Sequence, residues 1–508
     1  MKNKAIFSLL LSLFLCNAET LQFNSIEEFR KSLAESQNKK TFIETYLKEI
    51  TRLDREVNSI ISLYDTTQLY KSYVYGRNKE WQGVPILIKD NIDSLGLANT
   101  AGSLSMLDNF PRRDAHLVKQ LKKSGFLIIG KANLSEWANF RGRNSVSGWS
   151  SYGGQTRNPY DLDYNPCGSS SGSAAAVALG LTPVSIGTET NGSITCPASI
   201  NGVVGIKPTV GLVSRHGIIP ISSTQDTAGP MARNVYDAAV VLKTISGKDI
   251  KDTATSKIPS NFDFSGLVNL NKNYLEGKKI GLILPGDGDL EITFTLINKA
   301  KEVFLSSGAE IVPLTLEPLP NNFWSSALFI LEHEFFISLN EYLKKSKSSM
   351  KNIQAIVDFN NANRKETMSF YGQEYFLSSI AAGPGKKIGD ISTDEIYQEA
   401  LRIVEFSRKY LDKVLMENEL DAIVGLTRNT AWKIDYKNGD NFENGWGNGA
   451  LSAISGYPHI TIPLALVDGF PTGLSFMGTA WDEVNLLNLA YSFEQQNSFF
   501  PKPTINKN

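Results

Sequence analysis

Hydrophobic positions along this chain follow two periods. Apolar residues recur every three to four positions in some stretches, which predicts amphipathic helices, and form short continuous runs in others, which predicts buried strands. Helices are predicted at 25–75, 116–123, 173–179, 292–306, most of 321–410 and 482–495, with one more beginning near 134–136. Strands are predicted at 84–88, 126–129, 182–186, 278–286, 309–314, 421–426, 459–463 and 472–477. Because helices and strands alternate, we expect an α/β sandwich.

The pattern shows no clear linker. Residues 247–275 are polar and rich in turn-forming residues, so we expect a long surface connection there. Predicted strands recur on both sides of it, which favours one domain spanning 19–508. Its parts are N-terminal helices at 19–75, a core at 76–246, a variable helical region with strands at 247–420, and C-terminal core strands and a helix at 421–508. A Lys/Ser-rich patch at 344–351 is typical of a solvated face.

Composition places the chain among globular proteins. Its 508 residues are 42% hydrophobic and 20% charged, and the formal net charge is −1. There is no block of five basic residues. We therefore expect no nucleic-acid partner, because phosphate binding needs clustered positive charge.

The first residues have the three parts of a signal peptide. Lys2 and Lys4 precede an apolar run at 5–15, and residues 16–18 form a small-residue cleavage site. The run is too short to span a membrane, which takes about 20 residues. We predict a signal peptide at 1–18 and export to the periplasm or the medium. A buried N-terminal helix is the alternative, and Leu15 disfavours a lipoprotein anchored at Cys16.

Cleavage after Ala18 would leave two cysteines, Cys167 and Cys196. Two cysteines do not make a disulfide scaffold, so we expect two inert, small hydrophobic side chains. A bridge between them is the alternative. The four histidines lie far apart in the sequence, without the spacing of metal ligands, so we expect no metal and no cofactor.

Two loops dense in glycine and serine flank the predicted helix at 173–179. They span residues 168–173 and 190–193. Such stretches are costly in backbone entropy. Their proximity in the sequence suggests that backbone N–H groups and hydroxyls converge on a small ligand or a reacting atom.

These loops carry a family resemblance. The chain reads CGSSSGS, GTETNGSIT and GVVGIKPT in order, preceded by GVPILIKDNID and followed by STQDTAGPMAR and SGYPHITIPLALVDGFPTGLSFMG. This series resembles the amidase signature family, and the segment SITCPASINGVVGIKPTVGLVSRHGIIPIS is most similar to its peptide amidase branch. The resemblance covers roughly residues 75–500. It implies a single α/β/α sandwich with a mixed central sheet covered by helices.

The resemblance also implies a catalytic triad. Ser193 would be the nucleophile, Ser169 would sit on a cis peptide bond and relay a proton, and Lys89 would be the base. A lysine base must be neutral, and a free lysine with a pKa near 10.4 is almost wholly charged at pH 7. Burial can lower a lysine pKa by about 3–5 units. Because Lys89 follows the apolar run at 84–88, we expect it at a strand end inside the core.

The backbone before the nucleophile would form an oxyanion hole from Thr190, Asn191 and Gly192, with Ser170 as a supporting hydrogen-bonding group. The sequence departs from the common family pattern at Cys167, Ser171, Glu189, Asn191 and Thr195. Cys167 and Ser171 replace glycines. Thr195 stands where an arginine is common. Because that arginine can serve an anionic substrate group, its absence favours a neutral amide.

Another motif competes with this interpretation. Residues 168–172 match G-x-S-x-G, the nucleophile elbow of α/β-hydrolases, which would need a strand directly before Ser170 and a histidine such as His459. Asn165-Pro166 predicts a turn there instead. Without the resemblance, Ser169 and Ser193 would be taken as loop serines, and Lys89 as a surface residue.

We therefore expect an exported serine amidohydrolase that converts a carboxylic amide to acid and ammonia, acting on C-terminal peptide amides. The alternatives are a fatty acid or aryl amide hydrolase, the A subunit of a tRNA-dependent amidotransferase, and a catalytically inactive binding protein. A small-molecule or peptide amide is the expected partner, and the sequence leaves the oligomeric state open.

Overall fold

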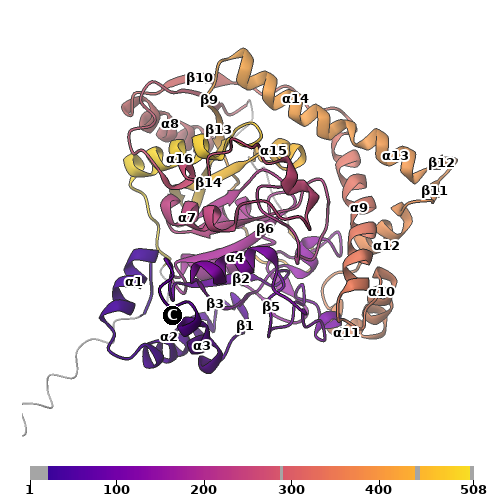
Figure 1. The fold of residues 1–508 in the computed structure, drawn as a ribbon. Helices are drawn as coiled ribbons and strands as arrows, with labels where there is room; N and C mark the ends of the chain where they lie inside the picture. The colour runs from indigo at the N-terminus through magenta and orange to yellow at the C-terminus, as the bar shows by residue number, and fades with distance from the viewer. Residues whose placement is uncertain (1–20, 287–289, 441–446, 504–508) are drawn as a thin grey trace, which may run out of the picture.

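The computed structural model describes residues 21–286, 290–440 and 447–503. The predicted signal peptide at 1–18 lies outside these ranges. The described residues form an α/β fold around an eleven-stranded mixed sheet (Figure 1). From one edge to the other its strands are β1 (Ile60–Leu63), β3 (Leu127–Ala132), β2 (Pro85–Lys89), β6 (Val184–Glu189), β8 (Thr227–Ala232), β7 (Val204–Lys207), β14 (His459–Val467), β15 (Phe470–Met477), β13 (Ala422–Leu426), β9 (Lys279–Ile283) and β10 (Glu310–Leu314).

Two parallel blocks flank an antiparallel centre. β3, β2 and β6 run parallel to one another at one side, and β13, β9 and β10 do so at the other. The strands between them pair antiparallel. Parallel neighbours end at the same edge of a sheet, so the carboxyl ends of β2 and β6 lie side by side. This edge carries the candidate site.

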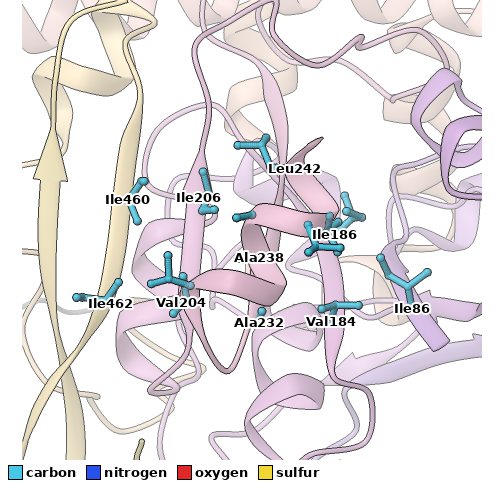
Figure 2. Packing of buried hydrophobic residues seen from close by; sticks show 14 of the residues in the cluster. Ile86, Val184, Ile186, Val204, Ile206, Ala232, Ala238, Leu242, Ile460 and Ile462 are labelled. Atoms are coloured by element: carbon cyan, nitrogen blue, oxygen red, sulfur yellow. The ribbon is translucent and has the colours of Figure 1, made fainter. Parts of the chain in front are cut away.

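Helices cover both faces of the sheet. They are α4 (His116–Ser124), α5 (Ser171–Ala178), α6 (Thr195–Ile200), α7 (Val235–Ile245), α8 (Glu291–Ser306), α15 (Ala450–Ser455) and α16 (Glu483–Asn497). Side chains of a strand alternate between the faces. In β6, Val184 and Ile186 pack with Ala238 and Leu242 of α7 (Figure 2).

The other face of β6 carries small residues. The Ser185 hydroxyl donates to the Ser173 carbonyl of α5 at 2.8 Å. A side chain on Gly187 would clash with Ser170, because an added Cβ would lie 2.7 Å from its hydroxyl oxygen. The alanine-rich helix α5 can therefore lie close against the sheet, and it brings the loop before it onto the edge where β2 and β6 end.

A separate helical layer packs beside the sheet. It comprises α9 (Phe323–Lys345), α10 (Ile353–Ala362), α11 (Arg364–Thr367), α12 (Glu374–Ala382), α13 (Thr393–Ala400) and α14 (Arg402–Glu417) (Figure 1). Arg141 ties this layer to the core. Its guanidinium pairs with Glu136 at 2.9 Å, lies 4.1 Å from the Tyr371 ring centre, and donates to the Tyr371 carbonyl at 3.2 Å.

The N-terminal part is less uniformly helical than its periodicity predicts. It contains α1 (Ile26–Glu35), α2 (Lys39–Asp54) and α3 (Thr66–Tyr75), but β1 interrupts it and forms an edge of the sheet. A helix begins near 134–136, as predicted, but it is a single short turn. The short helix η2 (Glu136–Asn139) holds Trp137 and Ala138 at left-handed angles, with φ of +53° and +54°, so no α-helix continues there.

Several elements lie where the pattern gave no signal. They are α6, β7 and β8 in the core, and the two short hairpins β4 (Trp149–Ser150) with β5 (Gly154–Gln155) and β11 (Lys387–Ile388) with β12 (Ile391–Ser392). Residues 247–275 contain only the short helices η3 (Thr253–Lys257) and η4 (Gly266–Val268), and they bury Leu267 and Leu275 in the core. A fourth short helix, η1 (Leu104–Met106), follows β2.

Within the described ranges, no helix combines the length and apolarity that crossing a membrane requires.

Candidate active site

Lys89 is the last residue of β2 and is fully buried. Its Nζ donates to the Ser169 hydroxyl at 2.7 Å, to the Thr188 hydroxyl at 3.0 Å and to the Thr188 carbonyl at 3.1 Å. Burial lowers its pKa from the usual 10.5 to about 7, against the opposing charges of Glu189 and Asp226. The apolar run at 84–88 predicts such a lysine at a strand end inside the core. With this pKa, about half of the Lys89 amines are neutral near pH 7.

Ser169 and Ser170 lie in the loop that leads into α5, and both are fully buried. The Gly168–Ser169 peptide bond is cis. The Ser170 hydroxyl donates to the Thr188 carbonyl at 3.1 Å, and its N–H donates to the Ser193 carbonyl at 3.1 Å. Ser170 thus connects the end of β6 and both glycine- and serine-rich loops.

Ser193 lies in the second loop, between β6 and α6, and is half-buried. In the part of the chain that the structure describes, its hydroxyl and the N–H groups of Asn191 and Gly192 have no hydrogen-bond partner within the protein. Gly192 adopts a φ of +81°, and no atom lies within 4 Å of the place where a side chain would begin. These groups are free to bind a ligand that enters beside Ser193.

Carboxylates hold this loop from both sides. On the carboxyl side, Glu189 Oε2 accepts the N–H groups of Ile194 and Thr195 at 2.8 and 3.0 Å. On the amino side, the Thr190 hydroxyl donates to Asp226 Oδ1 at 2.6 Å. The Glu189 side chain therefore caps the start of α6.

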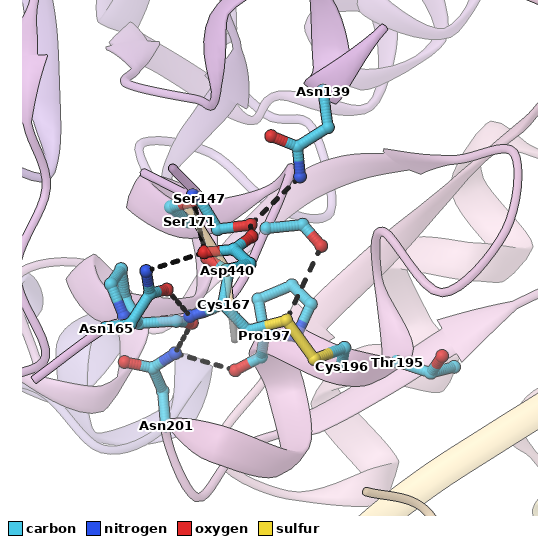
Figure 3. The surroundings of a disulfide bond; sticks show 12 residues. Asn139, Ser147, Asn165, Cys167, Ser171, Thr195, Cys196, Pro197, Asn201 and Asp440 are labelled. Carbon is cyan, nitrogen blue, oxygen red and sulfur yellow. Dashed lines mark hydrogen bonds between the residues drawn. A yellow bond between two sulfur atoms is a disulfide. The ribbon is translucent and has the colours of Figure 1, made fainter. Parts of the chain in front are cut away.

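Cys167 and Cys196 form a disulfide, so the expectation of two inert side chains is wrong (Figure 3). Their Cα atoms lie 6.1 Å apart, within the range a bridge requires. Cys167 adopts a left-handed φ of +56° at a position where the family commonly has glycine. The bridge joins the residue before Gly168 to the helix after Ser193. It thereby cross-links the two loops of the site.

Two pockets meet at Ser193. One contains Ser169, Thr190 and Asp226, and the other lies on the side of Cys167 and Gly192. The first is also lined by the apolar residues Ile218, Ile219, Pro220 and Ile221, and by the charged residues Arg215, Lys251 and Asp252. The second is also lined by Phe140, Leu328, Leu331 and Tyr375, and by the charged residues Arg143, Arg428 and Asp440. A ligand bound at Ser193 can therefore extend in two directions.

The structure contains no nucleophile elbow at Ser170. Residues 165–170 form no strand, so the strand that the G-x-S-x-G motif requires is missing from this described segment. His459 is buried in β14, and its Nε2 hydrogen-bonds with the Ser475 hydroxyl at 2.6 Å. Burial lowers its pKa to about 4, so it is neutral at neutral pH.

Three polar residues of the site had no predicted role. Thr188 binds Lys89, Asn91 donates to the Thr188 hydroxyl at 2.9 Å, and Asp226 binds Thr190. Thr188 and Asn91 belong to the quoted segments GTETNGSIT and GVPILIKDNID, and Asp226 to STQDTAGPMAR. Their membership in those segments was the available signal, but the sequence alone did not pair them.

Comparison with known proteins identifies the family of the chain. A family model described as Amidase matches residues 41–487. A probable amidase of Arabidopsis thaliana is 36% identical over 494 residues, covering 94% of this chain and 90% of that protein. The A subunit of the glutamyl-tRNA(Gln) amidotransferase of Caldanaerobacter subterraneus is 33% identical, covering 90% of this chain and 93% of that protein. The native peptide amidase from Stenotrophomonas maltophilia superposes with a TM-score of 0.86 at 38% identity, covering 96% of this chain and 99% of that one.

Proposed function

The chain belongs to the amidase signature family and is a hydrolase acting on amide C–N bonds, and from this premise we propose that Ser193, Ser169 and Lys89 carry out the reaction. The observation that supports these roles most strongly is the contact of 2.7 Å between the Lys89 amine and the Ser169 hydroxyl, in a pocket that Ser193 also lines. Serine is a weak nucleophile and needs an adjacent base.

In the neutral form of Lys89, the two N–H groups donate to Thr188 and the lone pair accepts the Ser169 proton. After protonation, all three N–H groups still have an acceptor, so the amine can gain a proton without losing a partner. Ser169 takes the Ser193 proton as it passes its own to Lys89. Ser193 Oγ bonds to the amide carbon, and the carbonyl oxygen becomes an oxyanion.

The N–H groups of Thr190, Asn191 and Gly192 stabilise that oxyanion. One such donor contributes roughly 10²–10³ in rate in comparable sites. The tetrahedral intermediate collapses as Ser169 returns a proton to the departing nitrogen, which leaves as ammonia. Water then attacks the acyl-enzyme by the same proton route and releases the carboxylic acid and free Ser193.

C-terminal peptide amides are the proposed substrates. The likeness to a peptide amidase over nearly the whole chain supports this, and so does Thr195, whose hydroxyl turns toward Glu189 and places no cation there. The pockets on the two sides of Ser193 leave room for a peptide to extend from the reacting carbonyl. The reaction needs no metal or cofactor in this scheme.

A panel of amides tests the substrate. Purified protein is incubated with an N-acetylated dipeptide amide, a fatty acid amide, an aryl amide and free glutamine, and released ammonia is measured, with Ser193→Ala as the control. We expect release from the dipeptide amide that is absent in the variant. Selective release from glutamine would favour the amidotransferase function, the candidate that the 33% identical relative supports. Selective release from the fatty or aryl amide would change the substrate assignment but leave the proposed mechanism in place.

We also propose that the protein is exported after removal of residues 1–18. The disulfide supports this, because such bridges persist in oxidising compartments. Mass spectrometry of the protein recovered from the periplasm and the medium tests it. A mature N-terminus at residue 19 is expected, and an intact Met1 in protein recovered from the cytoplasm would contradict it.

A further inference from the structure

Asp226 lies just before β8 and is half-buried, in the pocket that also holds Ser169 and Ser193. Its two oxygens have different partners. Oδ1 accepts the Thr190 hydroxyl at 2.6 Å, and Oδ2 accepts the N–H groups of Ile221 and Ser222 at 2.7 and 2.9 Å. The carboxylate thus joins the loop at 190–193 to the segment at 221–226.

We propose that Asp226 is a positioning residue that holds the loop at 190–193, so that the N–H groups of Asn191 and Gly192 point at the reacting carbonyl oxygen, and that Glu334 of α9 anchors Asp226 from the helical layer. This inference rests on the proposed function.

The loop needs such an anchor on its amino side. Asn191 is exposed, and Gly192 has open space around it and a backbone conformation that glycine adopts freely. Glu189 fixes the backbone only from Ile194 onward. Thr190 is the residue directly before the free N–H groups, and among the described residues its hydroxyl is bound by Asp226 alone. On the carboxyl side, the Gly192 carbonyl accepts the Cys196 N–H at 2.8 Å, so the Thr190 bond is what directs the N–H groups from the amino side.

Glu334 binds the segment at 221–226 from the helical layer. Its Oε2 accepts the Ser222 hydroxyl, and also the N–H and hydroxyl of Thr224, each at 3.1 Å. Its Oε1 accepts the Tyr397 hydroxyl of α13 at 2.7 Å. Glu334 is buried, with 2% of its surface exposed. A continuous series of hydrogen bonds therefore leads from the helical layer to the oxyanion loop.

The contacts of Asp226 distinguish this role from that of a base. All three of its hydrogen bonds come from protein donors, and none comes from Ser169, Ser193 or Lys89. Burial raises its pKa to about 6, against the lowering effect of those donors, so the carboxylate is mostly ionised at neutral pH. A base would need an oxygen directed at the reacting hydroxyl.

The test uses Asp226→Asn, Thr190→Val and their combination, with Thr190→Ser as the control that keeps the hydroxyl. Ammonia release from the dipeptide amide gives kcat and KM, and circular dichroism and thermal melting show that each variant is folded. We expect kcat to fall about 10- to 100-fold in both single variants, with KM within about threefold, because positioned oxyanion donors act in the transition state. Thr190→Ser should stay within about threefold of the parent.

The double variant should be no slower than the slower single variant, because both substitutions weaken the same contact between Thr190 and Asp226. Glu334→Gln should lower kcat about three- to tenfold. Tyr410→Phe, which removes a hydroxyl that accepts only the Glu317 N–H, is the control for the helical layer and should leave kcat unchanged.

A folded Thr190→Val variant with the kcat of the parent would overturn the inference, and so would effects of the single variants that multiply in the double. A change confined to KM would also overturn it. If Asp226→Asn does not fold, Thr190→Val and Glu334→Gln decide. Failure of the parent to release ammonia from any amide would instead overturn the proposed function, so the two failures are distinguishable.

Discussion

The titration of Lys89 gives a prediction that the structure makes quantitative. The amine must be neutral to accept a proton, and burial lowers its pKa to about 7. The neutral fraction is then about a half at pH 7, roughly a tenth at pH 6 and roughly nine-tenths at pH 8. We expect kcat/KM for the dipeptide amide to rise about tenfold from pH 6 to a plateau above pH 8.

A second group steepens the acid limb. Burial raises the pKa of Asp226 to about 6, so this carboxylate gains a proton below that pH and weakens its hold on Thr190. The slope of log kcat/KM against pH should therefore be near one between pH 6 and pH 7, and greater than one below pH 6. An ordinary lysine with a pKa near 10.4 would instead place the plateau above pH 10.

The assay measures initial rates of ammonia release between pH 5 and pH 9 at constant ionic strength. Lys89→Arg is the matched variant, because a guanidinium keeps its proton at every accessible pH. We expect its kcat/KM to stay at least about 10³-fold below the parent throughout. Flat activity of the parent between pH 5 and pH 8, or appreciable activity of Lys89→Arg, would refute the assignment of Lys89 as the base.

Three further predictions concern stability. The lowered pKa of Lys89 means that folding disfavours its charged form, at a cost in folding free energy that is present at pH 7 and vanishes above pH 10.5. The free energy of unfolding of Lys89→Met relative to the parent should therefore fall by about 3 kcal/mol between pH 7 and pH 10. Urea titrations that show no such change would contradict this. Replacing Cys167 and Cys196 with alanine removes a bridge across 29 residues, so we expect a loss of about 2–4 kcal/mol and a lower kcat, whereas unchanged stability and rate would show that the bridge holds nothing in place. Arg141→Met leaves the buried Glu136 carboxylate without its partner and should cost about 3–5 kcal/mol, which Glu136→Gln in the same chain should partly restore; an equally unstable double variant would argue against the pair.

Much of the fold follows from local pattern. The runs at 84–88 and 421–426 become β2 and β13, and the helix predicted at 116–123 becomes α4, which is capped by Gly125 with a φ of +99°. Local pattern fails where tertiary contacts decide. β8 contains Gly229 and Pro230, which weaken a strand signal, yet it pairs with both β6 and β7 in the sheet.

The candidate site was likewise predicted only in part. The motifs gave Lys89, Ser169 and Ser193 as candidates. In the fold, Lys89 contacts Ser169, and Ser169 and Ser193 line one pocket. The partner of Thr190 could not be read from the sequence, because Asp226 lies 36 residues away. The bridge between Cys167 and Cys196 was an alternative that the sequence could not favour, because the two residues lie 29 positions apart. Such pairs depend on how the loops fold over the sheet edge, which no local pattern records.

Covalent trapping of the nucleophile tests the central claim most directly. The folded protein is treated with an amidase-directed phosphonate, digested with a protease and analysed by mass spectrometry, beside Ser193→Ala and Lys89→Met. We predict a single adduct on Ser193, absent in Ser193→Ala and formed far more slowly in Lys89→Met. An adduct on Ser169 or Ser170, or equal labelling of Lys89→Met and the parent, would contradict the proposed mechanism.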